Sequence, residues 1–126
     1  MIVLDTHAVV WWTLEPSRLS RSATATIARA DRIGIPTTVF WETALLVRKG
    51  KLQMDLAVGE WARKILAIPR VEALPLSPEI AILADALEMH ADPADRFITA
   101  TAVVHHVPLL TKDKLLRELR CVHAIW

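Results

Sequence analysis

Two aspartates in this 126-residue chain follow short apolar segments, and their positions suggest chemistry at one edge of a sheet. Asp5 comes directly after Ile2-Val3-Leu4, and Asp113 comes shortly after Leu109-Leu110. Short apolar runs with β-branched residues are typical of strands buried on both faces of a parallel sheet. Because α/β folds bind ligands beyond the carboxyl ends of such strands, both carboxylates are predicted to lie on one rim. A simpler role is also open to each, since Asp is a favoured helix N-cap.

Glu42 is the acidic residue that capping does not explain. It lies in an apolar segment and shares one face of a predicted helix with Val39 and Leu46. A carboxylate in an apolar stripe costs free energy unless it has a partner. Arg48 and Lys49 are candidate partners, but they stand six and seven residues away, outside the favoured spacing of three or four. We therefore interpret Glu42 as a functional residue.

Asp92 and Asp95 open a further predicted helix, on either side of Pro93. Asp92 fits the N-cap, and Asp95 at the third helical position fits an arrangement similar to a capping box. Alternatively, Asp95 lies one turn inside the helix and faces the same crevice as Asp5. Arg96 follows, and its guanidinium can pair with a carboxylate or contact phosphate.

Taken together, these positions can place four carboxylates in one crevice: Asp5, Glu42, Asp95 and Asp113. Four such groups repel one another, so they either take up protons or need a cation. Oxygen ligands without a cysteine or histidine cluster suit Mg²⁺ or Mn²⁺. Cations held in this way support hydrolysis of phosphodiester bonds, because they activate water and stabilise charge on the phosphoryl oxygens.

The rest of the chain alternates between patterns typical of strands and of helices. Strands are predicted over residues 2–4, 32–36, 71–76, 108–111 and 122–125. Helices are predicted over residues 8–14, 20–31, 37–49, 55–67, 78–90, 93–106 and, as a single turn, 113–119. Thr37 or Thr38 is expected to cap the third of these. Such alternation implies parallel pairing through right-handed crossovers. The predicted fold is a three-layer α/β/α sandwich around a mainly parallel sheet of four to five short strands.

Length and composition are typical of one domain spanning residues 1–126. The net charge of +1, from 15 basic and 14 acidic residues, neither requires nor excludes a nucleic-acid partner. The single cysteine excludes an intrachain disulfide and a cysteine metal cluster. No apolar run approaches the roughly 20 residues that cross a bilayer, so we expect a cytoplasmic protein without a membrane partner.

The acidic motifs, in their order along the chain, resemble those of PIN-domain ribonucleases, specifically the VapC toxins of bacterial VapBC toxin–antitoxin pairs. The resemblance covers nearly the full length. It rests on Leu4-Asp5-Thr6-His7, on Trp41-Glu42 followed by Gly50-Lys51-Leu52, on residues 90–96, and on Leu110-Thr111-Lys112-Asp113. Each motif alone is weak, but their order and the 18-residue step from Asp95 to Asp113 are specific.

The resemblance assigns roles to individual residues. It implies that the catalytic and metal-binding residues are Asp5, Glu42, Asp95 and Asp113. Three further residues are expected to contact these ligands rather than the metal, namely Thr6, Thr111 and Asp92. Two basic residues are expected to contact RNA, namely Arg96 and Lys112. One residue departs from the family pattern, because His7 stands where the family more often has Asn.

The implied function is a Mg²⁺- or Mn²⁺-dependent endoribonuclease that cuts structured RNA, such as transfer or ribosomal RNA, in a single-stranded loop. A homodimer and a cognate VapB antitoxin that occupies the active-site groove are implied as well. One alternative is a non-catalytic binding module whose acids are only caps, and Glu42 argues against it. Another is an aspartyl-phosphate phosphatase with Asp5 as nucleophile. That chemistry typically has a second Asp two residues on, where this chain has His7.

Overall fold

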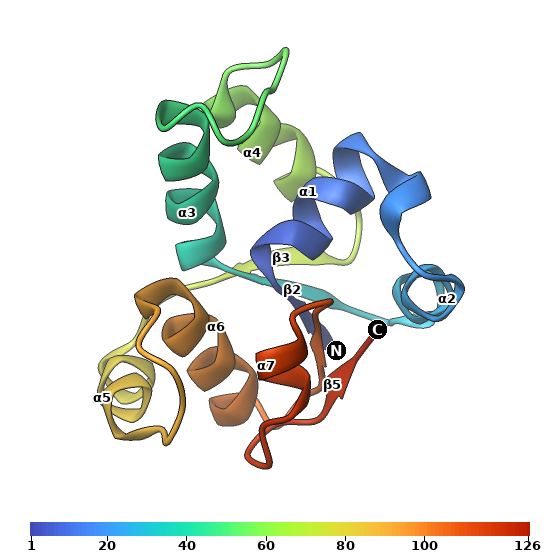
Figure 1. Cartoon of the computed structure of the whole chain (residues 1–126). Helices are drawn as coiled ribbons and strands as arrows, with labels where there is room; N and C mark the ends of the chain where they lie inside the picture. The colour runs from blue at the N-terminus through green and yellow to red at the C-terminus, as the bar shows by residue number, and fades with distance from the viewer.

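A five-stranded parallel sheet runs through the centre of the computed structural model, which describes residues 1–126 (Figure 1). Its strands are β1 (Ile2–Leu4), β2 (Ile33–Pro36), β3 (Val71–Leu74), β4 (Leu109–Leu110) and β5 (Ala124–Ile125). They lie in the order β3-β2-β1-β4-β5, and every pairing is parallel. The predicted parallel sheet is therefore confirmed.

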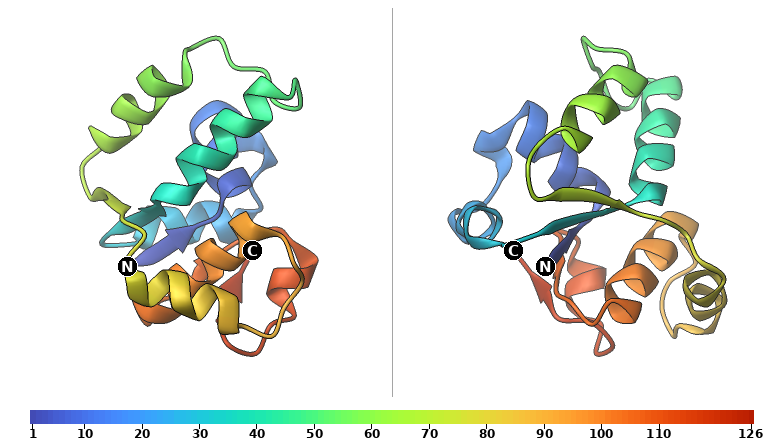
Figure 2. Two further views of the ribbon diagram at one scale, coloured as in Figure 1. Left: turned by 90° about the vertical axis from the view of Figure 1, so that its left-hand side faces the viewer. Right: turned by 180° about the vertical axis from the view of Figure 1, so that it is seen from behind.

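Helices cover both faces of the sheet, as crossovers between parallel strands require. They are α1 (Thr6–Leu14), α2 (Arg21–Arg29), α3 (Thr37–Arg48), α4 (Val58–Leu66), α5 (Pro78–Ala86), α6 (Pro93–Val104) and α7 (Lys114–Arg117), with a 3₁₀ turn at Pro16–Arg18. Helices α1, α3 and α4 lie on one side of the sheet, and α5, α6 and α7 lie on the other (Figures 1 and 2). This arrangement confirms the predicted three-layer sandwich. None of the helices combines the length and the apolar character needed to cross a bilayer.

The three central strands form the middle of the hydrophobic core. Their inner residues are almost completely inaccessible to solvent, including Val3, Leu4, Ile33, Ile35, Leu109 and Leu110. Burying each such side chain stabilises the fold by about 1.5–3 kcal/mol. Gly34 lets β2 approach β3, because a Cβ at this position would lie 2.6 Å from Leu74 Cδ1. The strands are therefore a rigid base for whatever their carboxyl ends carry.

The strand order creates a crevice between β1 and β4. The chain runs outward from β1 through β2 to β3 and then returns across the sheet to place β4 on the other side of β1. Leu4 pairs with Leu110, so the two strands end at the same level. Ligands of α/β folds bind at such a topological switch point, beyond the carboxyl ends of the strands. Asp5 and Asp113 follow these two strand ends.

Some element boundaries differ from the sequence predictions. α5 ends at Ala86 rather than near residue 90, because the carbonyls of Ala84 and Leu87 accept hydrogen bonds from Arg96 Nη1 (2.8 and 3.1 Å). β3 ends at Leu74, just before Pro75, which lacks the N–H that would extend the ladder. α4 begins at Val58 rather than at residue 55.

The predicted threonine cap of α3 is wrong. The helix begins at Thr37 directly after β2, with Pro36 in the N-cap position and no side-chain capping bond. The Thr37 hydroxyl donates instead to the carbonyl of Leu74 (3.0 Å) and so ties α3 to the end of β3. The predicted end of this helix is correct, because Gly50 follows it with a φ of +71°.

Candidate active site

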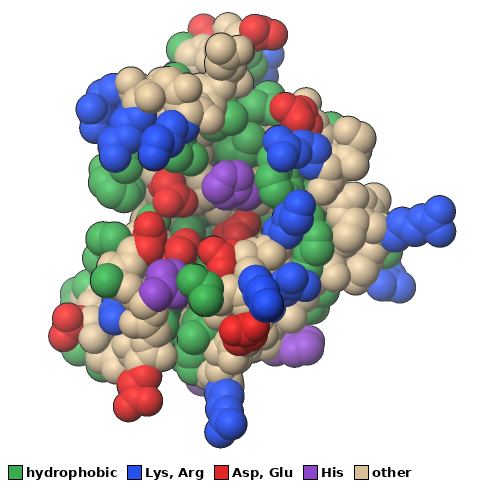
Figure 3. Space-filling model, in the orientation of Figure 1, with side chains coloured by type: hydrophobic (Ala, Val, Ile, Leu, Met, Phe, Trp, Pro, Cys, Tyr) green, Lys and Arg blue, Asp and Glu red, His purple; other side chains and the backbone are tan.

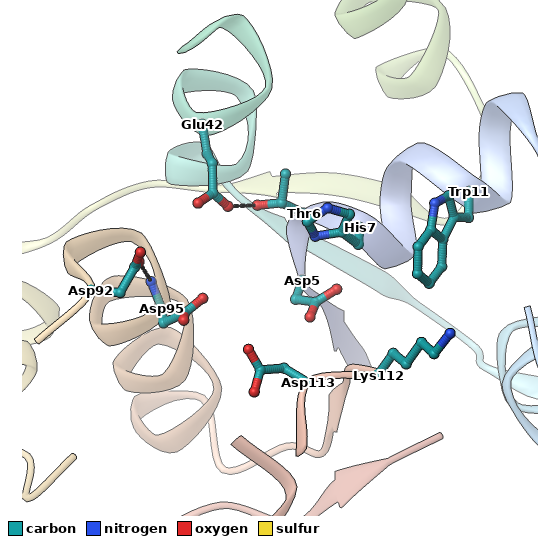
Figure 4. Close-up of a pocket in the computed structure, with 9 residues that line it drawn as sticks. All are labelled: Asp5, Thr6, His7, Trp11, Glu42, Asp92, Asp95, Lys112 and Asp113. Atoms are coloured by element: carbon teal, nitrogen blue, oxygen red, sulfur yellow. Dashed lines mark hydrogen bonds between the residues drawn. The ribbon is translucent and has the colours of Figure 1, made fainter. Parts of the chain in front are cut away.

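The structure places the four predicted carboxylates on one cavity of about 460 Å³ at the switch point. They come from four separate places, namely the end of β1, the middle of α3, the first turn of α6 and the segment after β4 (Figure 4). The cavity is lined by Asp5, Thr6, His7, Trp11, Glu42, Asp92, Asp95, Lys112 and Asp113. Acidic side chains gather at the centre of this face of the molecule, with lysines and arginines on either side (Figure 3).

Asp5 is the most deeply buried of these acids, at 7% exposed. Its Oδ1 accepts the N–H of Ala8 (2.9 Å) and caps α1, while Oδ2 accepts the hydroxyl of Thr111. Burial raises the pKa of Asp5 to about 6; the two hydrogen bonds oppose this shift, and the charges of Asp95 and Asp113 add to it. Asp5 therefore caps α1 and lines the acidic cavity at the same time.

Glu42 is partly buried on the face of α3 that looks into the cavity. It forms no ion pair with Arg48 or Lys49, so the local pairing considered from the sequence is not made. Its Oε1 accepts the hydroxyl of Thr6 instead (Figure 4). Burial raises the pKa of Glu42, and the negative charge of Asp95 raises it further.

Asp95 is held in place by two neighbours. Its N–H donates to Asp92 Oδ1 (3.0 Å), which makes Asp92 the N-cap of α6, as the sequence predicts. Its Oδ2 lies 2.8 Å from His90 Nε2. Burial raises the pKa of Asp95, although the bond to His90 opposes the shift. His90 was not predicted as a site residue, and its only signal in the sequence is its position five residues before an acid that opens a helix.

Thr111 connects two of the acids across neighbouring strand ends. Its hydroxyl donates to Asp5 and accepts the N–H of Asp113 (3.0 Å). Asp113 in turn caps α7, because its Oδ1 accepts the N–H of Leu115 (2.8 Å). The capping bonds of Asp113 use Oδ1 alone, and this leaves Oδ2 for the cavity.

The two basic residues predicted to contact RNA differ in their surroundings. Lys112 lines the cavity, and its Nζ lies 5.3 Å from the ring centroid of Trp11. Arg96 does not line it: its Nε, Nη1 and Nη2 donate to backbone carbonyls, including those of His90 (3.1 Å) and Met89 (2.8 Å). Arg96 pairs with no carboxylate, because its donors hold the connection between α5 and α6, and its contact with RNA stays a prediction.

His7 and Trp11 also line the cavity, although neither was predicted as a site residue. They stand four residues apart on α1 and therefore share one face of that helix. Their ring centroids are 5.5 Å apart. The signal available in the sequence was this spacing directly after Asp5, on the first helix to leave the sheet.

The donor set of the cavity fits a hard divalent cation. Five carboxylates face a single lysine, and burial raises the pKa of Asp5, Glu42 and Asp95. Oxygen donors of this kind suit Mg²⁺ or Mn²⁺. No three acidic, histidine or cysteine side chains already converge as ligands, so the carboxylates would have to draw together around an ion.

A parallel α/β sandwich with an acidic cavity at its switch point defines a structural class that hosts more than one chemistry. Comparison with known families is more specific, because residues 2–120 match the PIN domain. The chain belongs to the PIN-domain family.

Individual relatives agree with this assignment. The chain is 36% identical to Ribonuclease VapC22 of Mycobacterium tuberculosis (strain ATCC 25618 / H37Rv), over 94% of this chain and 92% of that protein. Its fold is similar to VapBC2 from Rickettsia felis bound to a DNA fragment from their promoter (TM-score 0.71, 17% identity, 99% and 98% of the two chains covered). It is also similar to a toxin–antitoxin complex from Klebsiella pneumoniae (TM-score 0.69, 20% identity, 100% and 97% covered).

Proposed function

We propose that the protein is a divalent-cation-dependent endoribonuclease and the toxin of a toxin–antitoxin pair. The observation that carries this proposal is the meeting of four carboxylates at the switch point of a PIN domain. The 36% identity to a ribonuclease favours RNA over other phosphodiester substrates. The substrate class we propose is structured cytoplasmic RNA, such as transfer or ribosomal RNA, cut in a single-stranded loop.

The chain's own residues would hold and orient the cation. The proposed ligands, acting directly or through water, are Asp5, Glu42, Asp95 and Asp113. When bound, Mg²⁺ or Mn²⁺ supplies positive charge to the phosphoryl oxygens and makes water a better nucleophile. Thr111 fixes Asp5 and Thr6 fixes Glu42 through hydrogen bonds. Asp92 caps the turn that carries Asp95, and Lys112 offers positive charge at the edge of the cavity.

Single-turnover cleavage of total cellular RNA tests this assignment, with Mg²⁺, Mn²⁺ or EDTA present. Asp5→Asn and Asp95→Asn keep the size of the side chain, and Asn can replace Asp5 as the N-cap of α1, so both variants should stay folded. Each loses a charge that the cation needs, and the rate should fall on the order of 100-fold or more. Asp85→Asn, an exposed acid outside the cavity, serves as the control. Folded Asn variants that cut at the wild-type rate would show that these acids have only structural roles.

We also propose a VapB-type antitoxin as the protein partner. The acidic cavity is complementary in charge to a basic segment, and the similar solved structures include toxin–antitoxin complexes. Expression of the chain alone should stop bacterial growth, and co-expression of its antitoxin should restore it. Normal growth without RNA cleavage, when the folded protein is expressed alone, would count against this proposal.

A homodimer is the oligomeric state that we propose, as the family resemblance implies. An apolar groove of about 260 Å³ between α3 and α6 is lined by Trp41, Leu76 and Phe97. Trp41 is 56% exposed, and large apolar side chains left exposed in this way mark interfaces. Light scattering should give the mass of two copies for the wild type and of one copy for Trp41→Lys. A monomeric wild type would contradict the dimer.

A further inference from the structure

His90 makes the one hydrogen bond of the Asp95 side chain, and no step of the proposed function uses it. Its Nε2 lies 2.8 Å from Asp95 Oδ2, while Asp95 Oδ1 has no hydrogen-bond partner. Figure 4 shows the Asp95 side chain, on the first turn of α6, pointing toward Asp5. One oxygen of the carboxylate is therefore held by His90, and the other is left for a cation.

The imidazole of His90 reaches Asp95 from outside the acidic cavity. Asp95 lines this cavity, and His90 does not. The two side chains are only partly exposed, 27% for His90 and 22% for Asp95, so the contact is partly shielded from water. His90 is therefore placed to orient the carboxylate without occupying the space in which a ligand of the cavity would lie.

The contact does not require a particular charge on the His90 ring. An ionised carboxylate can only accept hydrogen bonds, so Nε2 is the donor in this pair. A neutral imidazole with its proton on Nε2 donates in this way, and so does an imidazolium. His90 therefore holds the ionised Asp95 carboxylate in both of these protonation states.

The backbone of this segment is held without the imidazole. The N–H of Asp95 donates to the N-cap Asp92 (3.0 Å), and the Arg96 guanidinium donates to the carbonyl of His90 (3.1 Å). These bonds use the main-chain atoms of His90 and Asp95 and not their side chains. The hydrogen bond between the two side chains therefore adds orientation of the carboxylate to a backbone that is already fixed.

Two other acids of the cavity are held by side-chain donors in a similar way. Thr111 donates to one carboxylate oxygen of Asp5, and Thr6 donates to one carboxylate oxygen of Glu42. His90 is the corresponding donor for the acid on α6. Three of the four proposed ligands thus accept a hydrogen bond from a neighbouring side chain, and such contacts fix metal ligands in productive orientations.

We propose that His90 is a positioning residue for the cation site: it holds Asp95 Oδ2 and keeps Oδ1 available to a divalent cation in the cavity. The inference rests on the proposed function and extends it to a residue outside the cavity. Without His90, water would solvate Oδ2 and the carboxylate would turn more freely. The cation would then have to fix it on binding, and that ordering costs affinity.

Calorimetric titration of Mn²⁺ into the protein, without RNA, tests this role because it measures cation affinity apart from cleavage. His90→Leu removes the donor, so the Kd for Mn²⁺ should rise about 10- to 100-fold. His90→Ala repeats the test without adding an apolar side chain. His90→Gln places an amide N–H near the position of Nε2 and should recover most of the affinity. His105→Leu is the control, because His105 is exposed at the other end of α6 and lies outside the cavity.

The outcomes that would overturn the proposal are distinguishable. An unchanged Kd in folded His90→Leu and His90→Ala, with a wild type that binds Mn²⁺ and cuts RNA, would remove the positioning role and leave the ribonuclease proposal standing. A lower Tm in EDTA together with that unchanged Kd would make the role of His90 purely structural. Equal losses of affinity in His90→Leu and His90→Gln would identify the imidazole itself as a ligand. A folded wild type that neither binds Mn²⁺ nor cuts RNA would remove both proposals.

Discussion

Burial of the Asp5 carboxylate links the stability of the cation-free protein to pH. The pKa of Asp5 rises from 3.8 to about 6 on folding, so the folded protein binds this proton more tightly than the unfolded chain does. The stabilisation from the proton is fully present below about pH 4 and is lost as the pH rises through about 6. Above that pH the fold carries a buried charge, whose cost is reduced by the hydrogen bonds from Ala8 and Thr111.

Asp5→Asn should therefore stabilise the cation-free protein at pH 8, by about 1–3 kcal/mol, and should have little effect at pH 4. Urea unfolding in EDTA at both pH values measures the difference. Asp31→Asn is the control with the opposite sign, because the bond from the N-terminal ammonium lowers the pKa of Asp31. The stabilisation that ionised Asp31 gives the fold is present above the pKa of the unfolded chain and is lost as the pH falls. An Asp5→Asn variant less stable than the wild type at pH 8 would refute the interpretation.

The Thr111 hydroxyl is a second single group with a measurable effect. Thr111→Val keeps the shape of the side chain but removes the donor to Asp5 and the acceptor for Asp113, so it should destabilise the fold by about 1–3 kcal/mol. Thr111→Ser should recover most of the loss. Thr99 is a matched control, because it is equally buried and its hydroxyl has no hydrogen-bond partner. Equal losses of stability in Thr99→Val and Thr111→Val, by thermal unfolding, would contradict a specific role for the hydrogen bonds.

At the scale of helices and strands, local chemistry was enough to predict most starting points. Ser20 and Ser77 cap α2 and α5, because their hydroxyl oxygens accept the N–H groups of Ala23 (2.9 Å) and Ile80 (3.2 Å), and serine is a favoured N-cap residue. These bonds join residues three apart, so a local pattern contains them. The end of α5 was not predictable in the same way, because it depends on Arg96 from another helix.

The candidate site shows the same division between local and distant information. Asp5 and Asp113 follow strand ends, and Asp95 opens a helix, so each could be selected from its own neighbourhood. Lys112 meets Trp11 only because β4 returns to the side of β1, and no spacing in the sequence encodes that contact.

Arg96 holds the segment that connects α5 to α6, and this allows a prediction about the stability of that segment. Its guanidinium donates to carbonyls of Ala84, Leu87, Met89 and His90, which fixes the segment leading into α6. Arg96→Lys replaces this planar group with one ammonium that cannot serve them together. We expect a loss of about 2 kcal/mol and faster amide hydrogen exchange across residues 84–92. Arg63→Lys, at an exposed position on α4, is the control. Unchanged exchange across residues 84–92 would show that the connection does not depend on Arg96.

At the scale of the whole molecule, the strand order explains why acids far apart in the sequence meet. The alternating pattern predicts a parallel sheet, but it does not say that β4 returns to the side of β1. That return brings the segment after β4 next to Asp5 and places the first turn of α6 opposite them (Figure 4). The connection from β3 to β4 packs against the shared hydrophobic core. The position of β4 is therefore specified only by the complete fold.

The acidic cavity should make the stability of the whole molecule depend on a divalent cation, because an ion that binds only the folded array of carboxylates stabilises it by mass action. Mn²⁺ at about 100 times its Kd adds about 2.7 kcal/mol, which raises the Tm of a chain of this size by about 10 °C. The double variant Asp5→Asn/Asp95→Asn lacks two of the proposed ligands and should show little shift in differential scanning calorimetry. Asp85→Asn, whose side chain is exposed outside the cavity, should shift like the wild type. An equal rise in Tm for the wild type and the double variant would place the ion elsewhere on the molecule.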